Sequence, residues 1–175
     1  MSVRRVSLLA VLLLAVPARA SVVEPLDLPA LSRGADLIVR GQVVRAVSAW
    51  DGDHIVTRST IEVRRVWKGR AGRTVVVRTL GGVVGTIGQK APGEASLAPG
   101  EEVILFLEAA GGGEFLPAGM ALGKFAVSGD GWATQDLAGL TLARRDAAGV
   151  VLVEPRPLRL PVRELEARVR RLVAR

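Results

Sequence analysis

Cysteine and tyrosine are both absent from this sequence of 175 residues, and histidine occurs once. Without cysteine the chain can form no disulfide, no thiolate zinc site, no cysteine nucleophile and no lipid-modified cysteine. The six aromatic residues, three Trp and three Phe, are scattered, so the chain lacks the stacking surface on which single-stranded nucleic acid or sugars bind. Burial of aliphatic side chains must therefore hold the protein together.

A strong excess of charge of one sign is also missing. The whole chain has a formal net charge of +7, but Arg4, Arg5 and Arg19 lie among the first 20 residues, and the remainder carries 21 basic against 17 acidic residues, a net charge of +4. The basic isoelectric point arises because arginine far outnumbers lysine and because tyrosine and cysteine are absent, not because of a large electrostatic field. We therefore expect no nucleic-acid partner.

The N-terminus has the three regions of a secretory signal peptide in the right order. Residues 1–5 include two arginines, residues 6–16 form an apolar run, and residues 17–20 end in small side chains. The apolar run has 11 residues, whereas a membrane-spanning helix needs ~20. We predict cleavage between Ala20 and Ser21, which places a mature chain of 155 residues outside the cytoplasm, secreted or periplasmic, as one domain with no membrane-spanning segment.

The mature chain has a predominantly β pattern. Residues 21–36 predict an N-terminal segment with a short helix within 25–35, and residues 37–160 predict a β domain. The glycine-rich stretch 81–100 predicts an irregular, mobile surface loop. Strands are expected at 37–47, 55–67, 74–80, 103–107, near Phe115, and at 124–127, 132–135, 140–143 and 150–153, with a hairpin turn at Asp51-Gly52-Asp53.

Three details of these strands depend on packing. Residues 103–107 are apolar without alternation, which is typical of a strand buried on both faces. The alternation of 55–67 slips at Arg64-Arg65, where the sequence is compatible either with a β-bulge that keeps Val66 inward or with the end of the strand. Gly41, inside the first strand, is typical of a sharp bend or a bulge.

Residues 161–175 predict a C-terminal amphipathic helix. Pro161 stands where helices often begin, and Glu164–Arg168 and Glu166–Arg170 have the four-residue spacing of stabilising ion pairs. One face of the helix is apolar and consists of Val162, Leu165, Val169, Leu172 and Val173.

The C-terminal helix has two possible roles. In the simpler interpretation its apolar face caps the β domain. In the alternative, its basic face contacts an anionic surface, and the candidate residues are Arg163, Arg168, Arg170 and Arg171.

Catalytic groups are sparse. His54 is the only histidine and adjoins Asp51 and Asp53, so a hydrolase triad with Ser48 or Ser59 is conceivable. A lone histidine at a hairpin tip is more typical of a solvated turn residue, and we predict no catalytic residue.

Metal and cofactor sites are not indicated either. Asp51-Gly52-Asp53 resembles the start of a calcium loop, but the later oxygen ligands and the closing glutamate are missing from the sequence. The glycine-rich residues 82–88 match neither phosphate-binding glycine fingerprint, and no helix pattern follows them. We therefore predict no metal ligand and no cofactor.

Three runs of the sequence carry a resemblance to a known family: Ala35-Asp36-Leu37-Ile38-Val39-Arg40-Gly41-Gln42-Val43-Val44, Ile61-Glu62-Val63-Arg64-Arg65-Val66-Trp67-Lys68-Gly69 and Pro99-Gly100-Glu101-Glu102-Val103-Ile104-Leu105-Phe106-Leu107. They resemble the netrin-like and tissue-inhibitor-of-metalloproteinase group of OB-fold domains. Residues 119–125 are also similar to a segment of uncharacterised secreted bacterial proteins. The resemblance implies an OB-like closed barrel of about five strands, here with extra hairpins and the C-terminal helix.

The resemblance also implies a function for the mature N-terminus. Inhibitors of this group begin with Cys-x-Cys-x-Pro, where the free α-amine and a carbonyl chelate the zinc of a protease. The matching residues here are Ser21, Val22, Val23, Glu24 and Pro25, in which proline keeps its place and both cysteines are replaced. These five residues are therefore the candidate partner-binding segment, with the Ser21 amine as a candidate ligand to a partner's zinc.

Three functions are compatible with these observations. The resemblance and the sparse catalytic groups favour an exported, non-enzymatic binding or inhibitory module that acts on another secreted protein, a protease among the candidates. The alternative is an envelope-associated structural protein whose basic helix lies at an anionic surface, with an association that weakens strongly in salt. A hydrolase centred on His54 is the third hypothesis.

Overall fold

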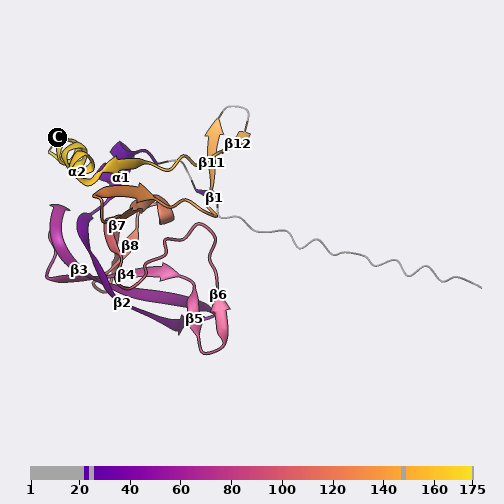
Figure 1. Ribbon diagram of the computed structural model, residues 1–175. Helices are drawn as coiled ribbons and strands as arrows, with labels where there is room; N and C mark the ends of the chain where they lie inside the picture. Colours follow the sequence, from indigo (N-terminus) through magenta and orange to yellow (C-terminus); the bar gives the residue numbers. More distant parts are fainter. Residues whose placement is uncertain (1–21, 24–25, 147–148, 175) are drawn as a thin grey trace, which may run out of the picture.

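The structure of the chain is a computed structural model that describes residues 22–23, 26–146 and 149–174 (Figure 1). These residues are mainly β, and a helix lies close to the C-terminus, as predicted. None of the helices in these ranges is both long and apolar enough to cross a membrane. The elements in chain order are β1 (Val22–Val23), α1 (Leu28–Gly34), β2 (Leu37–Asp51), β3 (His54–Lys68), β4 (Thr74–Leu80), β5 (Gly82–Val84), β6 (Ile87–Gln89), β7 (Glu102–Gly111), β8 (Glu114–Pro117), the 3-10 turn η1 (Met120–Gly123), β9 (Lys124–Val127), β10 (Trp132–Gln135), β11 (Thr141–Asp146), β12 (Gly149–Val153), β13 (Arg159–Pro161) and α2 (Val162–Val173).

Eight of the strands form one mixed sheet in the order β13-β10-β9-β7-β2-β3-β4-β8. Strand β8 is parallel to β4 and also pairs antiparallel with β7, so the pairings from β7 through β2, β3, β4 and β8 return to β7 and make a partial ring. Two small sheets stand beside it: β1-β11-β12, and the β5-β6 hairpin. In Figure 1 the β11-β12 and β5-β6 hairpins project from the side of the molecule away from α2.

The buried side chains form two clusters, because β2 and β7 are covered on both faces. Along β7, Ile104 and Phe106 point into one cluster, whereas Val103, Leu105 and Leu107 point into the other. All five of these side chains are 0% exposed, which confirms the prediction of a strand apolar on both faces.

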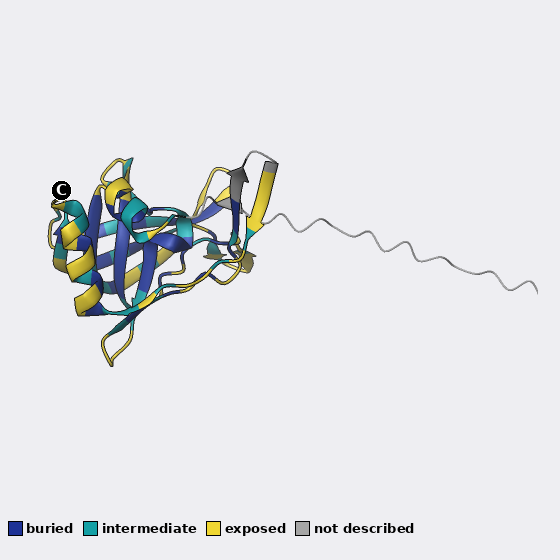
Figure 2. Ribbon diagram, turned by 90° about the horizontal axis from the view of Figure 1, so that it is seen from above, coloured by how far each residue is buried: buried dark blue, intermediate teal, exposed yellow. Residues whose placement is uncertain are grey.

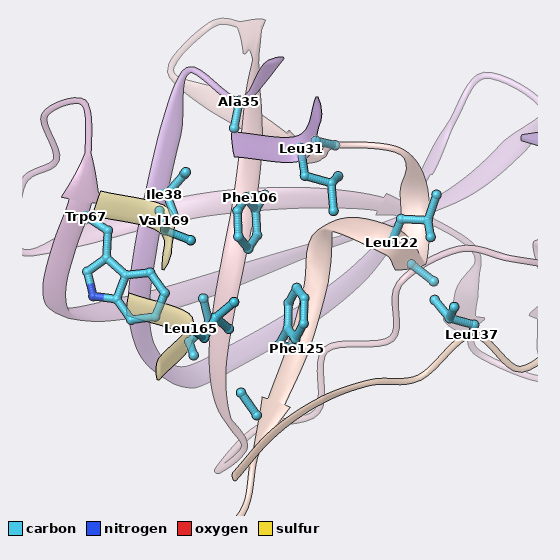
Figure 3. Packing of buried hydrophobic residues seen from close by; sticks show 14 of the residues in the cluster. Leu31, Ala35, Ile38, Trp67, Phe106, Leu122, Phe125, Leu137, Leu165 and Val169 are labelled. Atoms are coloured by element: carbon cyan, nitrogen blue, oxygen red, sulfur yellow. The ribbon is translucent and has the colours of Figure 1, made fainter. Parts of the chain in front are cut away.

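We call the first group the helix cluster, since both helices contribute to it; Figure 3 shows its large members. Its buried residues are Leu31, Ala35, Ile38, Trp67, Ile104, Phe106, Ala118, Ala121, Leu122, Phe125, Ala133, Leu137, Leu140, Leu142, Val162, Leu165 and Val169. We call the second group the ring cluster, since the ring strands supply most of it. Its buried residues are Leu37, Val39, Val43, Ile61, Val75, Val77, Leu97, Val103, Leu105 and Leu107.

The slip in the alternation of β3 is a change of register and not a strand end. Arg40 lies opposite Arg65, and the next residue, Gly41, lies opposite Val63, so Arg64 has no opposite partner in β2. A Cβ atom on Gly41 would stand 2.4 Å from the carbonyl oxygen of Glu62, which explains why this strand carries glycine at its bend.

The glycine-rich stretch 81–100 differs from the sequence prediction. It contains the β5-β6 hairpin, so the expectation of an irregular loop is wrong for these strands. The Thr57 hydroxyl donates a hydrogen bond to the Gly81 carbonyl at 2.6 Å, and the Ser48 and Thr57 hydroxyls lie where a Cβ atom of Gly82 would stand. Glycine therefore allows the chain to approach the β2-β3 hairpin closely, which local sequence pattern does not reveal.

Candidate functional site

Helix α1 begins at Leu28, and two residues separate it from the predicted partner-binding segment. Asp27 is its N-cap, because its Oδ1 atom accepts a hydrogen bond at 2.8 Å from the backbone N–H of Ala30. Leu31 anchors the helix in the helix cluster at 2% exposure. Of the predicted segment, Val22 and Val23 form β1, parallel to β11, whereas Ser21, Glu24 and Pro25 lie outside the described residues.

Helix α2 covers the helix cluster with Val162, Leu165 and Val169, which are buried, so its apolar face caps the β structure. It lies beside α1, at the same end of the molecule (Figures 1 and 2). Leu172 was also predicted on the buried face, but it is only half-buried because it borders a surface cavity.

The charged residues of α2 are largely paired. Arg168 pairs with Glu164 at 2.5 Å, and Arg170 pairs with Glu166 at 3.0 Å, as the four-residue spacing predicted. Glu166 also accepts from Arg65 of β3 at 3.2 Å, which ties the helix to the sheet. Two of the arginines of the basic face are therefore already paired with acidic side chains of the same helix.

Three surface cavities of about 520, 270 and 480 Å³ follow one another beside the helices. The first and second share Leu28 and Arg168, and the second and third share Leu26, Asp27, Gln135 and Arg156. We call this series the helix groove. Its remaining lining residues are Pro29, Leu31, Leu122, Phe125, Leu137, Leu142, Val153, Glu154, Leu158, Arg171 and Leu172.

The floor of the helix groove is part of the helix cluster. Five lining side chains are buried members of that cluster: Leu31, Leu122, Phe125, Leu137 and Leu142; Figure 3 shows the first four. Gln135 is 7% exposed and lies at this floor. Its side-chain N–H donates to the Leu122 carbonyl at 2.7 Å, and its side-chain oxygen accepts from the Leu158 backbone N–H at 2.9 Å. These two hydrogen bonds join β10 to η1 and to the segment before β13 at the floor of the groove.

Arginine side chains line all three cavities. Arg168 and Arg171 line the first, Arg168 and Arg156 the second, and Arg156 the third. The acids among the described lining residues are Asp27 and Glu154, and one oxygen of Asp27 accepts the hydrogen bond that caps α1. The groove therefore combines an apolar floor with a basic rim.

The structure places two of the four predicted arginines of the basic helix in the groove, beside residues that follow the predicted partner-binding segment. Arg168 and Arg171 of the basic helix line the same groove as Leu26 and Asp27, which follow the predicted partner-binding segment. Arg163 and Arg170 do not line it. Arg156 was not predicted, because its position in an irregular segment has no periodic pattern that relates it to α2.

The groups of the conceivable triad are not hydrogen-bonded to one another in the described structure. The His54 ring has the Gln89 amide as its neighbour at 3.5 Å, and the Ser48 hydroxyl is 2.9 Å from the Thr57 hydroxyl. Ser59 is 0% exposed. Within residues 22–23, 26–146 and 149–174, no three His, Asp or Glu side chains gather in a metal-ligand arrangement.

One carboxyl group outside the groove has a perturbed pKa. The Glu94 carboxylate accepts hydrogen bonds from the backbone N–H groups of Leu80 at 3.2 Å and Ala95 at 3.1 Å, and so fastens the segment after β6 to the end of β4. Burial raises the pKa of Glu94, although both hydrogen bonds act in the opposite direction.

The sequence matches no protein-family model and no curated protein.

Proposed function

We propose that this chain is an exported, non-enzymatic binding module with an OB-like barrel, and that the helix groove receives a segment of another exported protein. The observation that carries the proposal is the groove itself, with its buried apolar floor and its rim of three arginines. Cavities that combine apolar walls with a few placed polar groups are the usual form of binding sites.

The pairing of the strands supports the OB-like part of the proposal. The ring from β7 through β2, β3, β4 and β8 uses five strands, the number in an OB fold, and the netrin-like runs of the sequence lie in or beside β2, β3 and β7. The β5-β6 and β11-β12 hairpins and α2 are then additions to the barrel.

The chemistry of the lining residues supports binding over catalysis. Among the residues that the structure describes, the groove is lined by leucines, arginines, one glutamine, two acids and a few other apolar residues, and these include neither His54 nor a serine. Apolar contacts of this kind contribute about 25 cal/mol for each Å² removed from water, and the arginines orient the bound group.

The alternative function, an envelope protein whose basic helix contacts an anionic surface, also has an observation in its favour. Arg163, Arg168, Arg170 and Arg171 are all exposed on α2. Because Arg168 and Arg170 already pair with Glu164 and Glu166, this face attracts an anionic surface less strongly than four unpaired cations would.

The test uses the mature chain that begins at Ser21. Intact mass of the exported protein should show cleavage after Ala20, and retention of Met1 would contradict export by a cleaved signal peptide. The mature chain, carrying an affinity tag, is cross-linked in its own culture medium or periplasm, and any captured protein is identified, purified and titrated against it.

The decisive comparison is between two charge reversals on α2. Arg168→Glu with Arg171→Glu should abolish binding of the identified partner, because both residues line the groove. Arg163→Glu with Arg170→Glu changes the net charge equally but lies outside the groove, and should retain binding. Equal loss in both variants, together with binding that weakens steeply in salt, would favour the anionic-surface function.

A further inference from the structure

We infer that the segment bound in the helix groove is an extended, acidic and apolar polypeptide, with its leucine-like side chains in the cavities and a carboxylate between Arg156 and Arg168. The inference rests on the proposed function and adds the chemistry of the partner. It follows from the order of the cavities, from the placement of the arginines and from the position of the acids on α2.

The order of the cavities favours a chain over a compact ligand. Three cavities follow one another, and the middle one is the smallest, at about 270 Å³ between neighbours of about 520 and 480 Å³. Successive side chains of an extended peptide can fill separate cavities, while the backbone on the open side keeps its hydrogen bonds to water.

The arginines place a carboxylate at the middle cavity, where Arg156 and Arg168 both line the wall. Glu164 engages one Nη atom of Arg168, and a guanidinium group has five N–H donors, so the remaining donors can serve a second carboxylate. Arginine binds carboxylates through planar, paired hydrogen bonds, which gives this position geometric selectivity as well as charge.

The acids of α2 favour a peptide over a membrane surface. A flat bilayer would meet the exposed arginines of the helix, and Glu164 and Glu166 offset the charge of two of them, Arg168 and Arg170. The cavities, in contrast, are lined by half-buried apolar side chains such as Leu26, Leu28 and Leu158, which a narrow chain can contact more easily than a bilayer does.

The experiment measures binding of defined fluorescein-labelled peptides to the mature chain by fluorescence anisotropy. The first probe alternates leucine with glutamate over seven residues. The second replaces every glutamate with lysine, and the third replaces every leucine with serine. We expect the first probe to bind and the other two to bind at least about tenfold more weakly, since each lacks one of the two complementary features.

Matched variants locate the site. Arg156→Gln with Arg168→Gln should weaken the first probe about tenfold or more, because charge-assisted hydrogen bonds are lost. Arg163→Gln with Arg170→Gln removes the same charge outside the groove and should change binding less than about threefold. Arg156→Lys with Arg168→Lys keeps the charge and should still weaken binding, because lysine cannot make the paired contact.

Several outcomes would overturn the inference. These are equal affinity for the glutamate and lysine probes, equal loss in the two glutamine variants, or full affinity in the lysine variant. Binding to vesicles of phosphatidylglycerol and phosphatidylcholine that is lost in Arg163→Gln with Arg170→Gln, without peptide binding, would replace the peptide with a membrane surface. If no probe binds but a captured partner still depends on Arg168 and Arg171, the inference fails and the proposed function stands.

Discussion

The two hydrophobic clusters of this protein are built from different side chains. The buried residues of the ring cluster are all leucine, isoleucine or valine, whereas the helix cluster contains Trp67, Phe106 and Phe125, with the two phenylalanine rings 5.7 Å apart. Strands that curve around a shared interior leave room for aliphatic side chains, and the space between a sheet and two helices is filled by larger ones.

The clusters also differ in how much of the sequence they bring together. Most of the ring cluster comes from residues 37–107, whereas the helix cluster joins Leu31 of α1 to Leu165 and Val169 of α2, at opposite ends of the described chain. Only the helix cluster reaches the helix groove, so changes there affect both stability and binding. Four experiments can break or sharpen this comparison.

The largest effect is expected in the helix cluster. Phe106→Ala should lower the free energy of unfolding by about 3–5 kcal/mol, because the cavity removes an aromatic contact with Phe125. Leu105→Ala, its neighbour in the ring cluster, should cost about 2–5 kcal/mol and less than Phe106→Ala. Chemical denaturation measures both, and a larger cost at Leu105 would show that the ring cluster dominates stability.

The next variant tests whether α2 is a structural cap. Leu165 is 0% exposed, so Leu165→Ala should destabilise the protein by about 2–5 kcal/mol. Arg163→Gln, on the exposed side of the same helix, should change stability by no more than about 0.5 kcal/mol. Unchanged thermal stability in Leu165→Ala would mean that the helix cluster does not need α2.

Replacing each of two glycines with alanine should give a smaller difference in stability. Gly41→Ala should cost about 1–3 kcal/mol, because its Cβ atom would stand 2.4 Å from the backbone oxygen of Glu62. Gly34→Ala, at the end of α1, meets nothing within 4 Å and should be neutral or slightly stabilising. Differential scanning calorimetry should separate the two, and equal melting temperatures would argue against the close approach at the bend of β2.

The smallest effect is a pH dependence at Glu94, which holds the segment that carries Leu97 into the ring cluster. Burial raises the pKa of Glu94 above its usual value of 4.5, so above that pH the unfolded chain loses this proton before the folded protein does. The free energy of unfolding of the natural chain should therefore fall, relative to Glu94→Gln, as the pH rises from about 4.5 through the raised pKa. Parallel pH profiles of the two proteins would show that Glu94 titrates normally.

Most of the elements could be predicted from the sequence because their signals are local. The strands at 74–80, 124–127 and 132–135, the hairpin at Gly52 and the C-terminal helix coincide with the expected positions to within one or two residues. In each case alternation, turn residues or helical periodicity identified the element without knowledge of its neighbours.

The sequence by itself determined a mainly β chain with a helix near its C-terminus, since apolar periodicity and turn chemistry are properties of neighbouring residues. Only the tertiary structure decided that β8 pairs with both β4 and β7, that residues after Gly81 form a hairpin, and that Arg156 and Arg168 line one cavity. These features depend on contacts between residues far apart in the chain, and the sequence around one residue does not indicate which distant residue it will contact.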